Sequence, residues 1–150
     1  MCRSTNSSRR RRVTKRAGET RGASSLETRS ALRAIAAVQR ANGIAAFISG
    51  GRALDARSAL RAGVDLRTLL AGQAEGAERA LDMAEKLVSS GAVDLVVIHV
   101  GGSPSRRGGA RRLRALDSTA RRVGSTVLFI TSRNRRTLAR ATQEAGRAGA

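Results

Sequence analysis

The hydrophobic pattern of the chain alternates between short, unbroken apolar runs and longer segments with helical periodicity. Unbroken runs without polar alternation are typical of strands buried on both faces of a parallel sheet. Such runs predict strands at residues 44–48, 93–100 and 125–131, with a minor strand at 69–72. Apolar residues at helical spacing predict helices at residues 26–40, 54–62, 76–90 and 110–123.

Helices and strands therefore alternate along the chain, which predicts an α/β fold with a parallel sheet flanked by helices. Open sheets of this class bind ligands at the carboxyl ends of their strands. The strand predicted at 93–100 carries His99, the only histidine of the chain, at that end. His99 is a candidate site residue, although a polar residue that simply ends a strand is the more common case.

Composition adds a strong charge to this fold. The 150 residues carry a formal net charge of +18, almost entirely from arginine, and Phe47 and Phe129 are the only aromatic residues. An excess of this size indicates a polyanionic partner, with nucleic acid first and an anionic membrane surface second. Biased composition, giving a solvated arginine-rich surface, is the alternative.

Other classes are excluded by the sequence. Cys2 is the only cysteine, so an internal disulfide or a cysteine metal cluster is not expected. No apolar run approaches the roughly 18 residues of a membrane span, and no apolar signal segment follows the basic N-terminus. We expect a cytoplasmic protein with a basic arm at residues 1–20, a core at 21–140 and a flexible tail at 141–150.

Several short sequence motifs within the core resemble those of a known family. Residues 39–100, including Ala53-Leu54-Asp55, Gly63-Val64-Asp65 and Ser90-Gly91-Ala92-Val93-Asp94, closely resemble the ATPase core of the bacterial recombinase RecA. The resemblance implies a shortened RecA-like, P-loop NTPase-type sheet. It also implies the family's function, that of a DNA-dependent ATPase that forms filaments on single-stranded DNA, exchanges strands and triggers the SOS response.

In this resemblance, residues 21–28 stand where the family has its phosphate-binding loop. Such a loop uses glycines around the phosphates, a lysine for their charge and a hydroxyl for magnesium. Ser24, Ser25, Glu27 and Thr28 are the remnant of that loop, with Glu27 at the lysine position and Thr28 at the magnesium-ligand position. His99 replaces the acid that holds magnesium, and imidazole is a poor ligand for that ion.

Three further family positions differ. Residues 49–51 offer no carboxylate for activating water, Ser58 replaces the aromatic residue that stacks on adenine, and Ser132 replaces the glutamine that senses the γ-phosphate. These differences predict a protein with no bound metal, no cofactor and no ATP hydrolysis, an accessory relative of RecA. The alternatives are an active ATP-dependent recombinase and a cationic protein that coats nucleic acid.

The family also implies where DNA binds. Its two DNA-contacting loops correspond to residues 103–114 and 133–140, and the candidate DNA-binding residues in them are Arg106, Arg107, Arg111, Arg112, Arg133, Arg135 and Arg136. Without aromatic residues for stacking, binding is expected to be electrostatic, independent of sequence and directed to single-stranded DNA. RecA or a translesion polymerase is the expected protein partner.

The start of the core departs from the family. Residues 12–20 hold one apolar β-branched residue, so they are not expected to form the strand that precedes the phosphate loop. The strand predicted at 125–131 would lie beside that missing strand. Its edge is therefore expected to be unpaired.

Overall fold

A computed structural model describes residues 26–101 and 108–131. The predicted arm at residues 1–20 and tail at 141–150 lie outside these residues. The sheet holds four parallel strands in the order β2-β1-β3-β4: β1 is Ala45–Ser49, β2 is Leu70–Gln73, β3 is Leu95–Val100 and β4 is Thr126–Thr131. The α/β fold with a parallel sheet is thereby confirmed.

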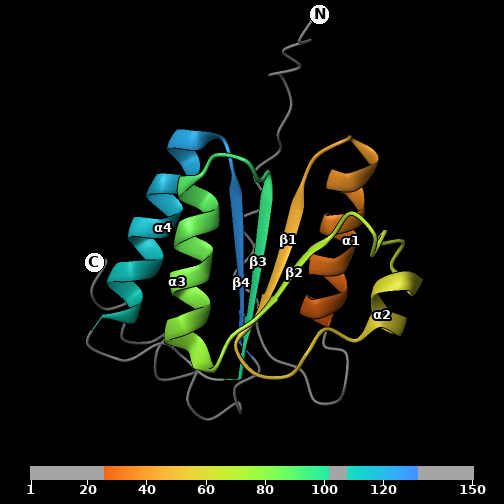
Figure 1. The fold of residues 1–150 in the computed structure, drawn as a ribbon, viewed down its shortest axis with the longest axis horizontal. Helices are drawn as coiled ribbons and strands as arrows, with labels where there is room; N and C mark the ends of the chain where they lie inside the picture. The colour runs from red at the N-terminus through yellow and green to blue at the C-terminus, as the bar shows by residue number, and fades with distance from the viewer. Residues whose placement is uncertain (1–25, 102–107, 132–150) are drawn as a thin grey trace, which may run out of the picture.

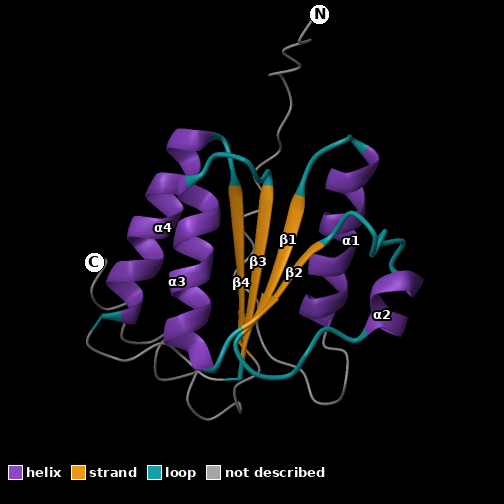
Figure 2. Cartoon of the chain, in the orientation of Figure 1, coloured by secondary structure: helices purple, strands orange, loops and turns teal. Residues whose placement is uncertain are grey.

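Helices cover both faces of this sheet (Figures 1 and 2). The helices α1 (Leu26–Arg40) and α2 (Ala56–Arg61) lie on one face. The helices α3 (Gly76–Ser89) and α4 (Gly109–Val123) lie side by side on the other. Every predicted element is present, and α1 has the predicted bounds.

Each face has its own apolar cluster, because successive residues of a strand point to opposite faces. Phe47 and Val97 pack with Leu32 and Ile35 of α1 on one side of the sheet. On the other side, the strands meet α3 and α4 through the buried residues Ala46, Ile48, Val96, Ile98, Leu81, Ala84, Val88, Leu116 and Ala120. The unbroken apolar runs of β1 and β3 are thus explained by burial on two faces.

The strand β4 differs from its prediction as a third buried strand. Of its six residues only Ile130 is buried, and the other five are partly exposed. The reason is its position, because within the described residues β4 pairs only with β3 and forms one edge of the sheet. The predicted unpaired edge therefore holds for this part of the chain.

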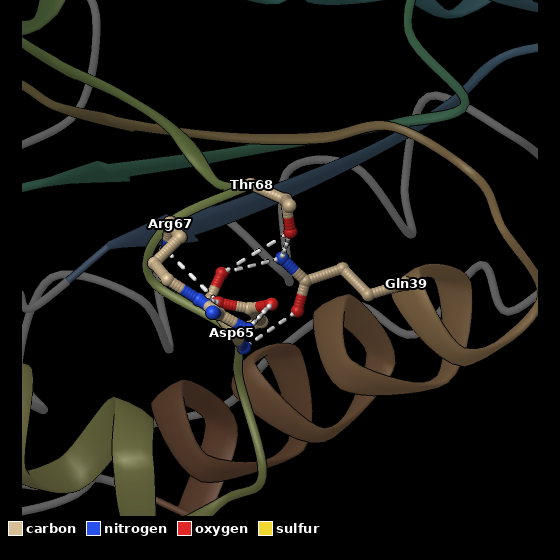
Figure 3. A network of polar contacts seen from close by, with 4 residues as sticks. All are labelled: Gln39, Asp65, Arg67 and Thr68. Atoms are coloured by element: carbon tan, nitrogen blue, oxygen red, sulfur yellow. Dashed lines mark hydrogen bonds and ion pairs between the residues drawn. The ribbon is translucent and has the colours of Figure 1, made fainter.

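A polar network fastens α1 to the segment between α2 and β2 (Figure 3). The side-chain amide of Gln39 donates to the carbonyl oxygen of Asp65 at 2.8 Å and to the hydroxyl of Thr68 at 3.1 Å, while its oxygen accepts from the backbone N–H of Asp65 at 2.9 Å. Arg67 in turn pairs with the carboxylate of Asp65 at 3.1 Å. Gln39 thereby satisfies backbone groups that no strand or helix pairs.

None of the helices in the described ranges has both the length and the apolar character needed to cross a membrane.

Candidate functional site

Three polar side chains form a row at the carboxyl edge of the sheet. Ser49 at the end of β1 is in register with Gln73 at the end of β2 and with His99 near the end of β3. Residues in register on parallel strands point to the same face, here the face that α1 covers. The sheet therefore brings together three residues that are up to 50 positions apart in the sequence.

The same edge carries the first turn of α1. That helix ends at Arg40, just before β1 begins at Ala45, so the helix runs opposite to the strands and starts beside their carboxyl ends (Figure 1). Glu27 and Thr28, two of the predicted phosphate-loop residues, lie in this first turn. Ser24 and Ser25 lie outside the described residues.

Glu27 has a structural explanation at this position. The start of a helix carries a partial positive charge from its unpaired N–H groups, and an acidic side chain in the first turn stabilises it. The side chain of Glu27 is partly buried there. An acid in place of the phosphate-loop lysine is therefore also an ordinary helix-stabilising residue.

The backbone after β1 is tied to its neighbours at this edge. The N–H of Gly50 donates to the carbonyl oxygen of His99 at 2.8 Å, and the amide of Gln73 donates to the carbonyl oxygen of Gly51 at 3.1 Å. The hydroxyl of Ser49 donates to the carbonyl oxygen of Arg52 and accepts from the N–H of Gly51 at 3.3 Å. The turn at residues 49–52 is thus held by all three strand ends.

Gly50 is required for this close approach. A Cβ at that position would lie 2.7 Å from the carbonyl oxygen of Gly76 and 2.7 Å from Cγ1 of Val100. Such distances are too short for real Cβ atoms, so a larger residue would displace α3 or β3. At Gly51, in contrast, no atom lies within 4 Å of the Cβ position.

His99 is half-buried in this edge, with its ring centroid 6.1 Å from that of Phe47. Burial lowers the pKa of His99 below its ordinary value, and the nearby positive charge of Arg52 lowers it further. The imidazole is therefore neutral at neutral pH. This setting agrees with a polar residue that ends a strand, the more common case for such a histidine.

The ends of the described strands carry neutral polar side chains. Magnesium prefers hard oxygen ligands, and the strand ends supply one imidazole, two hydroxyls and one amide, from His99, Ser49, Thr131 and Gln73. No cluster of three histidine, cysteine or acidic side chains that could hold a metal ion occurs within residues 26–101 and 108–131. Thr28 is the one described hydroxyl at a family magnesium position.

Ser58, at the position of the stacking aromatic residue, has a local role in α2. Its N–H donates to the carboxylate of Asp55 at 3.2 Å and its hydroxyl to the same oxygen at 2.5 Å. Asp55 is the N-cap of α2, and these bonds hold the pKa of its carboxyl below the usual value. Ser132, which replaces the family's γ-phosphate-sensing glutamine, lies outside the described residues.

Only two of the candidate DNA-binding arginines fall within the described residues, and they differ. Arg111 and Arg112 lie in the first turns of α4, where Arg111 is exposed and Arg112 is partly buried. The others lie outside the described ranges: Arg106, Arg107, Arg133, Arg135 and Arg136. For these five residues DNA binding stays a prediction.

Arg112 contacts three carboxylates of α3. Its guanidinium lies 2.9 Å from Glu78, 2.5 Å from Asp82 and 3.0 Å from Glu85. These carboxylates raise the pKa of Arg112 above its ordinary value, and its side chain is 29% exposed. The geometry therefore favours Arg112 as a contact between helices, because a DNA phosphate would compete with three partners.

This contact is the feature that sequence reasoning missed. Glu78, Asp82 and Glu85 of α3 all meet Arg112 of α4. Their spacing of four and three residues places them along one side of the helix. The arginines of the next helix were the only sequence signal for this ion-pair cluster. The packing of α3 on α4 decides that Arg112, and not a neighbouring arginine, forms it.

The chain matches one protein family over most of its length. The family model of the RecA N-terminal domain matches residues 11–104. Protein RecA of Mycobacteroides abscessus is 52% identical over 75 residues, which are 50% of this chain and 22% of the relative. Protein RecA of Tropheryma whipplei is 38% identical over 126 residues, covering 71% of this chain and 28% of the relative. The chain thus spans about a quarter of the length of these curated relatives.

A solved structure shares the fold at low sequence identity. SulA from Pseudomonas aeruginosa aligns with a TM-score of 0.54 over 76% of this chain and 95% of that protein, at 21% identity. At this identity the likeness concerns the fold alone. It supports the arrangement of helices on both faces of a parallel sheet.

The prediction of a protein without ATPase activity is wrong. The matched region includes the phosphate-loop segment and the strand that ends at His99, and the relatives are RecA proteins, a family of DNA-dependent ATPases by the resemblance described above. The prediction inferred a lost activity from residue types at single positions. Glu27 and Ser58 each stabilise a helix start, so their presence does not measure catalysis.

The identity of the chain rests on three agreeing observations. Helices and strands alternate along the chain, and the sheet is parallel. The sequence of residues 11–104 matches one family. The match covers more than half of the 150 residues. The chain therefore belongs to the RecA family, whose N-terminal domain it matches.

Proposed function

We propose that the chain is a RecA-like DNA-binding protein of DNA recombination and repair. The observation that carries this proposal is the match to the RecA N-terminal domain over residues 11–104, together with curated relatives named RecA. A role in the SOS response, as an accessory protein in the cytoplasm, belongs to the same proposal and is supported by the family resemblance.

The charge of the chain supports DNA as the partner. A formal net charge of +18 draws phosphate, and arginine forks bind phosphate oxygens in pairs. Both phenylalanines contribute to the core, since Phe47 is 2% exposed and Phe129 packs against the cluster beneath α3 and α4. Neither is placed to stack on bases, so we propose electrostatic binding to single-stranded DNA, independent of sequence.

The test is fluorescence anisotropy of a labelled thirty-nucleotide oligo(dT) with the full chain, between about 50 and 300 mM salt. Affinity is expected to fall steeply, because the logarithm of the binding constant of single-stranded DNA falls by about 0.7 for each phosphate contact per tenfold rise in salt. Absence of binding at the lowest salt contradicts the proposal. Repeating the titration with magnesium and ATP measures whether nucleotide changes the affinity for DNA.

The proposed protein partner is RecA or a translesion polymerase. Identity of about half with RecA proteins over 75 residues supports the first, because similar surfaces can join the same assembly. Co-sedimentation of the chain with RecA filaments on single-stranded DNA tests this partner. A chain that stays in the supernatant while it binds DNA alone contradicts it and favours the simple coating protein.

A further inference from the structure

The outward face of α4 carries a stripe of arginines. Arg111, Arg114, Arg121 and Arg122 are all exposed, at helical positions i, i+3, i+10 and i+11. At about 100° for each residue these four fall within an arc of about 100°. Gly109, Leu116 and Ala120, the buried residues of α4, lie on the opposite side of the helix.

The residues between these arginines are small. Ser118 is exposed and lies within the same arc, at position i+7 from Arg111, and the exposed Ala115, at i+4, lies about 20° beyond its border. They leave the middle of the helix surface open to a close approach. The stripe is about 16 Å long, at about 1.5 Å for each residue, so the four guanidiniums can reach several phosphates of one strand at about 3.4 Å each.

The charge of this stripe is largely uncompensated. Arg121 pairs with Asp117 at 2.5 Å, and this carboxylate is the only one in α4. Within the described ranges of the chain, Arg111, Arg114 and Arg122 form no ion pair. The stripe therefore presents four cations against one flanking anion.

Arg112 turns this face toward the outside. The side chain of Arg112 points away from the stripe, to the carboxylates of Glu78, Asp82 and Glu85 on α3. Figure 1 shows α4 beside α3 with one side away from both α3 and the sheet. This contact and the buried residues of α4 together orient the helix and with it the direction of the stripe.

We propose that the outward face of α4 is a binding surface for the phosphate backbone of nucleic acid. The residues that carry it are Arg111, Arg114, Arg121 and Arg122. This inference rests on the proposed DNA binding and places it on a helix face, including two arginines that lie beyond the predicted DNA loops. Charge complementarity selects the partner, because four exposed guanidiniums match a row of phosphates.

The test compares two full-length variants of equal charge. One replaces the four stripe arginines: R111Q, R114Q, R121Q and R122Q. The control replaces four exposed arginines on α1, α2 and α3: R33Q, R57Q, R61Q and R79Q. Each variant lowers the formal net charge from +18 to +14. The probe is the labelled oligo(dT), and thermal unfolding verifies that both variants fold.

The stripe variant is expected to lose the salt dependence of about four phosphate contacts. The slope of log affinity against log salt then falls by about 2 to 3, at about 0.7 for each contact. The control variant keeps the wild-type slope to within about one contact. Equal losses in both variants overturn the inference while DNA binding by the chain stands, whereas no binding by the wild type contradicts the proposed function itself.

A second probe separates nucleic acid from membrane. Vesicles with one third phosphatidylserine are mixed with the wild type and the stripe variant under the same salt series. The inference expects the stripe variant to bind oligo(dT) more weakly than wild type and to differ little from wild type on vesicles. If the stripe variant loses vesicle binding but keeps its affinity for oligo(dT), the surface is a membrane contact and the inference is wrong.

Discussion

The contact between Arg112 and α3 provides the sharpest prediction for the stability of the fold. Arg112→Ala removes a guanidinium that bonds three carboxylates at 2.5 to 3.0 Å. Asp82 and Glu85 then lose the guanidinium that they bond, Glu78 loses its contact with Arg112, and the three carboxylates face one another along α3. Like charges at these spacings destabilise a helix by about 0.2–0.5 kcal/mol for each pair.

The magnitude follows from the exposure of the four groups. Arg112 is 29% exposed, and its partners are 41 to 57% exposed, so each pair is screened by solvent. Exposed ion pairs contribute about 0.2–1 kcal/mol each. The loss of three pairs, with the repulsion that remains, is expected to lower the free energy of unfolding by about 1–2 kcal/mol.

Urea and thermal unfolding at low and high salt measure this loss. A protein of this size shifts its Tm by about 2–4 °C for each kcal/mol, and the shift is expected to shrink at about 1 M salt, where charges are screened. Arg111→Ala, next to Arg112 but exposed, is the control and should stay within about 0.5 kcal/mol of wild type. Equal stability of the two variants, or a loss that salt leaves unchanged, would refute the reasoning.

Three further predictions concern the carboxyl edge and the α1 network. Gly50→Ala should lower the free energy of unfolding by about 1–3 kcal/mol, because its Cβ meets α3 and β3, and Gly51→Ala should change it little; urea unfolding compares the two. The pKa of His99 is lower in the folded protein than in the unfolded chain, so the unfolded chain binds a proton at a higher pH. The free energy of unfolding should therefore fall as the pH drops below about 6.5. His99→Gln should reduce this pH dependence, as measured by unfolding curves at pH 5 and 7.5. Gln39→Ala should cost about 1–2 kcal/mol, measured by thermal unfolding, because the N–H of Asp65 loses its acceptor and the carbonyl of Asp65 keeps only the longer bonds from Thr68.

Each of these three has an outcome that contradicts it. Equal stability of the two glycine variants would mean that α3 and β3 move to accommodate the Cβ without loss of stability. An unchanged pH dependence in His99→Gln would assign the acid sensitivity to other groups. A Gln39→Ala variant as stable as wild type would mean that water replaces the amide bonds at no cost.

Much of the fold was predictable because its signals are local. Helical spacing of Leu32 and Ile35 predicts α1, and the unbroken run that ends at His99 predicts β3 as a strand buried on both faces. The exposure of β4 was harder to predict. Its sequence resembles that of β3, and only its place at the edge of the described sheet leaves five of its residues partly exposed.

The candidate site was predictable in part. The resemblance identified Glu27 and His99 as positions of interest, and the fold places both at the carboxyl edge of the sheet. The row with Ser49 and Gln73 depends on register between strands, which single-sequence patterns do not specify. The role of an altered residue was least predictable, because Ser58 bonds the N-cap Asp55 of α2 where the family comparison suggested only a loss.

The sequence by itself determined the class of the fold, its family and the sign of its surface charge. These properties arise from periodicity, sequence words and composition, which need no knowledge of distant contacts. The tertiary structure decided which arginine of α4 faces inward. Arg111 and Arg112 are adjacent and chemically identical, but a helix turns about 100° between them, so one meets three carboxylates of α3 and the other faces away.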